Sequence, residues 1–213
     1  MTAELALKLG QTFGTFFNGK GKVLVARDTR TSSEMLRSAL ISGLLSTGIN
    51  VVDAGLAPVP ALSHCVKEGF DAGVMITSSH NPPEYNGMKF MTGESVEFSS
   101  GEEKKFIELA KKEPIKADWD KVGKLEEQDI LEKYSKKLIG LIDAEAVRSG
   151  KFKVVVDTGN GAQGKLMPGL LEKLDCEVVG LFTKLTGIFE RAPEPRPETL
   201  DVLIEKVKAE NAD

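Results

Sequence analysis

The order of apolar and helical segments constrains this chain's fold more than any other feature of its sequence. Apolar runs of strand length at residues 23–26, 50–53 and 72–76 alternate with helix-like patterns at residues 31–47 and 60–68. Strands that alternate with helices at such short spacing form a parallel sheet with right-handed crossovers. The sequence therefore predicts an α/β fold.

Further helices are expected before and after this region. Residues 3–17 place leucines and phenylalanines on one helical stripe, with Thr2 available as the N-cap. The string Thr31-Ser32-Ser33-Glu34 matches a capping box at the start of the helix that follows it. A charged surface helix is predicted at 101–111 and an amphipathic helix at 131–142.

A second unit with the same pattern begins near residue 152. The segment 152–158 resembles the segment 22–29, and both are followed by a helix-like stretch, a turn and a Val-Val strand. We interpret this as a weak internal repeat. It predicts two successive three-layer α/β/α domains with mostly parallel sheets.

The two units are expected to be joined by the polar stretch from residue 111 to residue 128. We place the first domain at residues 1–125 and the second at residues 126–213. Trp119 is the one large apolar group in the connection, so we expect it to pack against a domain.

The composition excludes several classes of partner. Apolar residues make up 41% and charged residues 28%, as in globular proteins, and the net charge of −4 argues against nucleic acid or an anionic membrane as partner. No apolar run approaches the roughly 20 residues that span a bilayer, and the start does not resemble a secretion signal. Cys65 and Cys176 are expected to be buried thiols. A cytoplasmic location fits these observations.

The stretch from Thr77 to Phe90 is the strongest functional candidate. It follows the predicted strand 72–76, so its hydroxyls, imidazole and amides lie at the carboxyl end of a strand, where open α/β sheets bind ligands. Two prolines and Asn86-Gly87 stiffen and turn the loop, although such residues also occur in ordinary turns.

A glycine-rich string supports a rival hypothesis. Residues 159–164 match G-x-G-x-x-G between a strand and a helix, as in a dinucleotide-binding module. The acidic residue expected about 20 positions later is missing, because Gly180-Leu181-Phe182-Thr183 stands there. A turn in the second domain is the preferred interpretation.

The stretch from Thr77 to Phe90, which we call the serine loop, closely resembles the phosphoserine loop of the α-D-phosphohexomutases, the phosphomannomutase and phosphoglucomutase family. That family has a Ser-His-Asn-Pro loop followed by Asn-Gly-x-Lys. The matching positions here are Ser79, His80, Asn81, Pro82, Asn86, Gly87 and Lys89. The family is assembled from successive α/β domains, so the resemblance extends over the whole chain.

The resemblance implies an enzyme that interconverts hexose 1-phosphate and hexose 6-phosphate. It implies that Ser79 carries the phosphoryl group and that Lys89 has an acid–base role toward a sugar hydroxyl. A phosphate nearby raises a lysine's pKa, which favours a proton donor or charge clamp over a base. Mg²⁺ would contact Ser79 through its phosphate, and a hexose 1,6-bisphosphate would serve as activator.

Four further residues are candidates for phosphate contacts. His80 either donates a hydrogen bond to phosphate or ties the loop to nearby backbone. Asn81 is assigned to phosphate binding with the loop. Arg27 and Arg30 end a predicted strand at the same sheet edge, where they either bind phosphate or pair locally with Asp28.

The resemblance is incomplete at both ends. The family begins with a strand and a Thr-Ser-Gly-x-Arg-Gly segment, and its Asp-Gly-Asp-x-Asp-Arg metal loop follows a segment like Asn211-Ala212-Asp213. We therefore expect a front portion that is inactive alone, with missing C-terminal domains as its partners and an open sheet edge that allows self-association. A dinucleotide-binding module and a non-catalytic interaction protein remain as alternatives. The type of hexose is left open.

Overall fold

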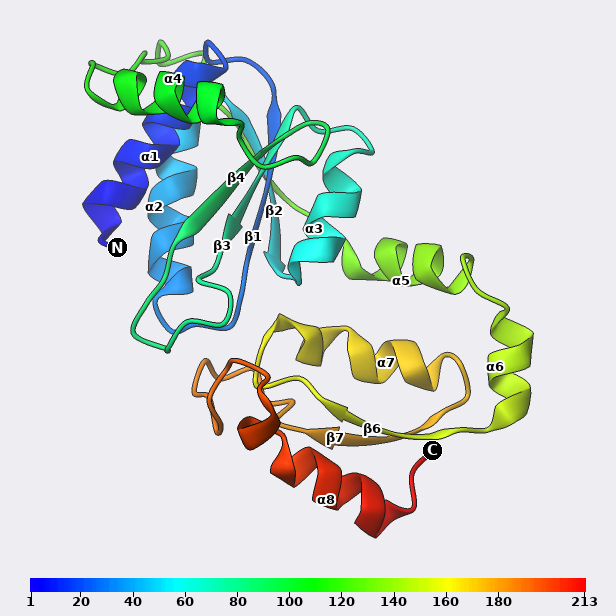
Figure 1. Ribbon diagram of the computed structural model, residues 1–213. Coiled ribbons are helices and arrows are strands. Elements are labelled where there is room, and N and C mark those ends of the chain that lie inside the picture. Colours follow the sequence, from blue (N-terminus) through cyan, green and yellow to red (C-terminus); the bar gives the residue numbers. More distant parts are fainter.

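The computed structural model describes all residues from 1 to 213 and consists of two α/β units (Figure 1). The first unit forms an open sheet with helices on both faces. Its elements are α1 (Ala3–Phe16), β1 (Lys22–Arg27), α2 (Ser33–Ser46), β2 (Asn50–Leu56), α3 (Val59–Val66), β3 (Ala72–Ile76), β4 (Met88–Thr92), α4 (Ser100–Ala110), β5 (Leu125–Glu127) and α5 (Leu131–Ile139).

The first sheet has the strand order β4-β3-β1-β2-β5. Every neighbouring pair is parallel except β3 with β4, which is antiparallel. Consecutive parallel strands leave their carboxyl ends at one edge of the sheet. That edge faces the second unit (Figure 1). The predicted α/β fold with a mostly parallel sheet is confirmed.

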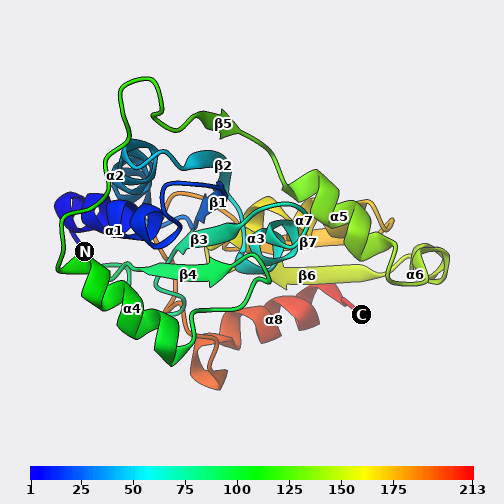
Figure 2. The same cartoon turned by 90° about the horizontal axis from the view of Figure 1, so that it is seen from above.

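Two apolar cores sandwich this sheet. Helices α1, α2 and α4 lie on one side and α3 and α5 on the other (Figures 1 and 2). Alternation along β1 divides its side chains, since Val23 and Val25 belong to the first core and Leu24 to the second. Leu166 of the second unit also belongs to the second core, so apolar packing connects the two units.

Helices α1 and α2 cross at a point where both carry glycine. A Cβ at Gly10 would overlap the carbonyl oxygen of Leu40, and a Cβ at Gly43 would overlap that of Leu7. The Cα atoms of the two glycines therefore approach as closely as the backbones allow. This contact fixes how α1 lies on the sheet.

The second unit repeats the strand–helix–strand order on a smaller scale. Its elements are α6 (Ala144–Gly150), β6 (Lys153–Asp157), a 3₁₀ turn (Ala162–Lys165), α7 (Met167–Glu172), β7 (Glu177–Leu181), a 3₁₀ turn (Pro197–Thr199) and α8 (Asp201–Glu210). Strands β6 and β7 are parallel, and α7 and α8 lie on opposite faces (Figure 1). The prediction of two three-layer units is confirmed.

An ion cluster ties α8 to β6. Lys153 Nζ lies 2.8 Å from a Glu210 carboxylate oxygen, and Lys206 contacts the other oxygen. These two ammonium groups hold the pKa of Glu210 at about 2, below its ordinary value. Helix α8 is therefore anchored at its C-terminal turn.

The predicted connection between the units is shorter than expected. Residues 125–127 form β5, which pairs with β2 and belongs to the first sheet. The preceding stretch also bonds to the first unit, because the Ala117 amide donates to the Ser46 carbonyl. Trp119 was expected to pack against a domain, but its side chain projects from this stretch and the residue is 92% exposed.

The predicted capping box at α2 is wrong. Ser32 stands at the N-cap but makes no side-chain cap bond. The predicted box partner Glu34 pairs with Arg27 and Arg37, and the Ser33 hydroxyl donates to the buried Asp28 Oδ1 at 2.8 Å. Thr2 does cap α1, as predicted.

The two thiols are buried, as expected from the sequence. Cys65 and Cys176 lie in different units and form no disulfide. Burial raises the pKa of the Cys65 thiol. Among the helices, none combines the length and apolar character required to span a bilayer.

Replacing Gly43 by alanine should destabilise the first unit. The added methyl group would overlap the Leu7 carbonyl, and such overpacking costs about 1–3 kcal/mol of unfolding free energy. Gly169→Ala in α7 is the matched control, because nothing lies within 4 Å of the Cβ it would add. Chemical denaturation measures both; equal midpoints would contradict the close helix crossing.

Candidate active site

The serine loop leaves the carboxyl end of β3 and returns to β4. The Thr77 amide donates to the Gly87 carbonyl at 3.0 Å, which closes the loop at its base. Ser79 and His80 lie in the first half of the loop and are exposed. The loop stands at the carboxyl end of β3, as the sequence predicted, and this edge of the sheet faces the second unit (Figure 1).

Ser79 has an unusual backbone conformation. Its φ of +52° lies in the left-handed region, which residues with a Cβ adopt at a cost. The Ser79 amide donates to Thr77 Oγ1 at 3.0 Å. Such strain persists where surrounding contacts enforce it, and it is concentrated at functional sites.

The buried carboxylate of Asp28 organises the base of this loop. Its Oδ1 accepts from the Arg30 amide at 3.0 Å and from the Ser33 hydroxyl. Its Oδ2 accepts from Thr77 Oγ1 at 2.7 Å and from Arg30 Nε at 3.2 Å. The residue is only 8% exposed, and these four bonds satisfy it.

Arg30 is enclosed by the loop. Its side chain has no exposed area, and all five of its N–H donors are engaged. Nε bonds to Asp28, and the two terminal nitrogens donate to the carbonyl oxygens of Ser79, Asn81, Pro82 and Tyr85 at 2.6–2.9 Å. Phosphate binding by Arg30 would require these bonds to break, so the structure favours the local-pairing alternative for this residue.

The loop's polar side chains have distinct partners. His80 Nδ1 lies 3.3 Å from Ser79 Oγ, so the imidazole stands directly beside the serine hydroxyl. Asn81 Nδ2 donates to Ser78 Oγ at 3.0 Å. Asn86 Nδ2 donates to the hydroxyls of Ser32 and Ser33 at the start of α2. The amides thus brace the loop and leave the Ser79 hydroxyl open.

A cleft of about 450 Å³ lies between this loop and the second unit. Ser79 and His80 line it together with Asp157, Gly159 and Arg191. Arg191 Nε and Nη2 donate to the Asp157 carboxylate at 2.8 Å and 3.1 Å. Sequence reasoning missed this ion pair, because nothing in the local pattern connects the end of β6 to residue 191.

Specific contacts join the two walls of the cleft. The Thr29 hydroxyl donates to the carbonyl of Asn160, which is fully buried, at 2.7 Å. Gly187 packs so closely on Thr29 and Thr31 that a Cβ there would overlap the Thr29 carbonyl. The ring of Phe189 lies 5.2 Å from the Arg30 guanidinium. These contacts therefore fix the position of the second unit relative to the serine loop.

Lys89 lies on β4 and does not line the cleft. In the β3–β4 pairing it stands opposite Met75, and Met75 lines the cleft. Its ammonium lies 2.9 Å from Glu97 Oε1, and the Lys89 side chain is 41% exposed. Lys89 thus lies on the strand that follows the loop carrying Ser79 and is paired with the Glu97 carboxylate.

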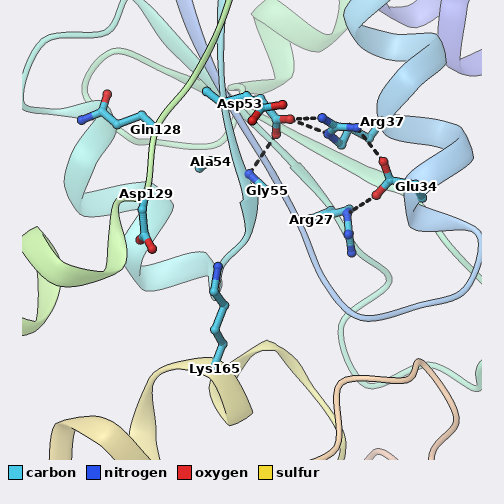
Figure 3. A pocket seen from close by; sticks show the side chains of 10 residues that line it. Arg27, Glu34, Arg37, Asp53, Ala54, Gly55, Gln128, Asp129 and Lys165 are labelled. Carbon is cyan, nitrogen blue, oxygen red and sulfur yellow. Dashed lines mark hydrogen bonds and ion pairs between the residues drawn. The ribbon is translucent and has the colours of Figure 1, made fainter.

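Arg27 borders a different pocket, of about 400 Å³. Its Nε pairs with Glu34 Oε2 at 2.8 Å, and Arg37 bonds to Asp53 (Figure 3). The Asp53 carboxylate raises the pKa of Arg37 above its ordinary value. Lys165 of the second unit points into this pocket from the opposite side (Figure 3). Arg27 and Ser79 thus line separate pockets.

The glycine-rich string is part of the joint between the units. Gly159 has a φ of +53°, and a Cβ there would contact the Arg191 guanidinium. Asn160 bonds through its side chain to Lys184 and Glu190 backbone groups. The second half of the string forms a short 3₁₀ turn, Ala162–Lys165, so the string presents no long helix N-terminus to a dinucleotide phosphate.

The donor set around Ser79 does not by itself fit magnesium. The structure contains no group of three or more His, Cys, Asp or Glu side chains placed to hold a metal ion. Asp28 and Asp157, the carboxylates that line the cleft, are bonded to Arg30 and Arg191. A divalent cation would need oxygen ligands other than these.

Ser79→Gly should be more stable than Ser79→Ala by about 0.5–1 kcal/mol. A Cβ at φ +52° costs about 1–2 kcal/mol, which glycine's greater loss of chain entropy offsets in part. The same two substitutions at Ser78, whose φ is not positive, provide the control and should favour alanine. Thermal or denaturant unfolding gives the order; the same order at both positions would contradict the strain.

Comparison with known families identifies both units. Residues 1–116 match the description "Phosphoglucomutase/phosphomannomutase, alpha/beta/alpha domain I", and residues 132–213 match domain II of the same family. The first match covers β1 to β4 of the first sheet, and the second match begins within α5 and covers the second unit.

Individual relatives agree. A phosphoglucomutase/phosphomannomutase of Thermococcus kodakarensis is 43% identical over all of this chain and 48% of its own length. A probable phosphoglucosamine mutase of Pyrococcus abyssi is 41% identical over 47% of its length. The chain thus spans about half the length of the curated relatives it matches.

Solved structures show the same fold. A putative phosphomannomutase from Thermus thermophilus superimposes on 97% of the chain with a TM-score of 0.86 at 28% identity, over 48% of its own chain. A family member from Burkholderia thailandensis covers 100% with a TM-score of 0.77 at 32% identity, also over 48% of its own chain. This chain belongs to the phosphoglucomutase/phosphomannomutase family, the phosphohexomutases.

Proposed function

We propose that this chain provides the phosphoryl-carrying part of a phosphosugar mutase that interconverts hexose 1-phosphate and hexose 6-phosphate. The single observation that carries the proposal is the setting of Ser79. Its hydroxyl is open at the carboxyl edge of the sheet, in a cleft shared by two units, on a loop whose backbone is held by a buried arginine.

The chemistry is a pair of phosphoryl transfers. With a phosphoryl group on Ser79, a sugar hydroxyl oxygen forms a bond to phosphorus as the bond to Ser79 Oγ breaks. The sugar hydroxyl loses its proton and Ser79 Oγ gains one, so the products are a hexose bisphosphate and the free serine hydroxyl. After the bisphosphate reorients, Ser79 Oγ takes back the other phosphoryl group. Such transfers depend on position and charge neutralisation, which a preset loop favours.

The neighbouring residues have proposed roles in this scheme. His80, 3.3 Å from Ser79 Oγ, donates a hydrogen bond to the phosphoryl group, and Asn81 holds the loop beside it. Lys89 serves as proton donor or charge clamp toward the phosphate dianion. For this it must leave Glu97. Arg27 contributes positive charge from the adjacent pocket.

The substrate class is a phosphosugar, and a hexose 1,6-bisphosphate is the proposed activator. The relatives are named for glucose, mannose and glucosamine phosphates, and we leave the choice among the three open. Mg²⁺ is proposed for the complete protein, where the phosphate on Ser79 would be one ligand. Self-association through the outer edge of β4 is a further proposal.

One phosphoryl group is expected on Ser79 after exposure to glucose or mannose 1,6-bisphosphate. Peptide mass spectrometry on the protein expressed from its complete gene measures it, with Ser79→Ala as control. Ser78 is the internal comparison, because it lies one residue away in the same loop. Phosphate on Ser78 with Ser79 bare would disprove the assignment, and no phosphate in the loop would favour a non-catalytic interaction protein.

The 213-residue chain alone is expected not to isomerise sugar phosphates. Its cations near Ser79 are already paired: Arg30 with the loop, Arg191 with Asp157 and Lys89 with Glu97. Loss of one preorganised electrostatic donor lowers turnover about a hundredfold or more. A coupled assay that converts glucose 1-phosphate to glucose 6-phosphate tests this. Turnover above the Ser79→Ala background would refute it.

A further inference from the structure

Arg30 contacts the serine loop in a way that the proposed chemistry does not use. Four backbone carbonyls between residues 79 and 85 converge on its two terminal nitrogens. A chain reversal normally leaves such carbonyls to water. Here one planar group gathers them, so the course of the loop follows the shape of the guanidinium.

The bonds converge on the two sides of Ser79. On one side, the Ser79 amide donates to Thr77 Oγ1. On the other, the Ser79 carbonyl accepts from Arg30 Nη2 at 2.9 Å. Thr77 and Arg30 are themselves joined through Oδ2 of Asp28. Both peptide groups that flank Ser79 are therefore connected by hydrogen bonds, through Thr77 and Arg30, to the one buried carboxylate of Asp28. These bonds fix the φ and ψ angles of Ser79.

The second unit supports the same group. Phe189 lies 5.2 Å from the guanidinium carbon, within the range of a cation–π contact. Both Phe189 and Ser79 line the cleft. The position of the guanidinium thus depends on both walls of the site.

We propose that Arg30 is a positioning residue that, together with Asp28 and with Phe189 of the second unit, sets the left-handed conformation of Ser79 and so aims its hydroxyl into the cleft. The catalytic consequence of this conformation rests on the proposed function, whereas the conformational role of Arg30 does not. Lysine cannot replace Arg30, because an ammonium has three donors and no planar fork, whereas five donors are used here.

Amide hydrogen exchange of the 213-residue chain tests the conformational role. Arg30→Lys should speed exchange of the hydrogen-bonded amides of Ser79, Asn81 and Tyr85 about tenfold or more, as expected for lost bonds from a charged donor. Arg37→Lys is the matched control. Arg37 lies on α2 and, like Arg30, pairs with a buried aspartate, Asp53, but it does not touch the serine loop. This substitution should lower the thermal midpoint without changing loop exchange.

Phe189→Leu provides a second variant that retains apolar volume at a partly exposed position. It should speed loop exchange severalfold with an unchanged thermal midpoint, and it decides the question if Arg30→Lys does not fold. Loop exchange at the level of the Arg37→Lys control, in either variant that folds, overturns the proposal.

Kinetics on the protein expressed from its complete gene separate this proposal from the proposed function. Arg30→Lys should lower kcat and leave KM nearly unchanged, whereas Arg37→Lys should alter neither. A wild-type protein without mutase turnover would refute the proposed function and leave the exchange comparison standing. Unchanged kcat in Arg30→Lys, with wild-type turnover intact, overturns the positioning role.

Discussion

The contact on which the site depends is the buried pair of Asp28 and Arg30. Removing a carboxylate and a guanidinium from water is costly, and the cost is met only where hydrogen bonds replace the lost hydration. Here every donor of Arg30 is used, and the Asp28 carboxylate accepts four bonds. The pair is thus compatible with one course of the serine loop. Other courses would leave a buried charge without partners.

This pair also explains why the two units meet as they do. Asp28, Thr29 and Arg30 are consecutive, and Thr29 turns the other way to bond the buried Asn160. One short segment at the end of β1 therefore fixes the loop on one side and the second unit on the other. Gly187 allows the close approach, because no larger residue fits against the Thr29 carbonyl.

Much of the architecture could be predicted from the sequence, because it follows from local patterns. Apolar periodicity indicated the helices and the order of strands, and the serine loop was placed correctly after β3. The errors concern long-range competition. Thr31 and Glu34 fit a capping box locally, but the helix begins at Ser33 with Ser32 at the N-cap, and the Ser33 hydroxyl bonds to Asp28. Trp119 suggested packing by its size alone, yet it lies exposed on a stretch held to the first unit by backbone bonds.

The site residues divide in the same way. Ser79 and His80 were recognisable from one contiguous string, and the structure places them together. The role of Arg30 could not be decided, since its four carbonyl partners lie 49 to 55 residues away in sequence. Arg191 gave no sequence signal, because its partner Asp157 is 34 residues distant.

The polar pocket bordered by Arg27 and Lys165 affects how easily the two units can separate. Only one of its ten lining residues, Ala54, is apolar, and Lys165 enters it from the second unit (Figure 3). If the units separated on this side, the surfaces newly exposed to water would be polar and charged. Little hydrophobic free energy therefore opposes separation there. On the α3 side, where Leu166 is buried in the first unit's core, separation would expose hydrocarbon. The two units should therefore separate more easily at the polar pocket than on the α3 side, so we expect any opening between them to pivot about Leu166.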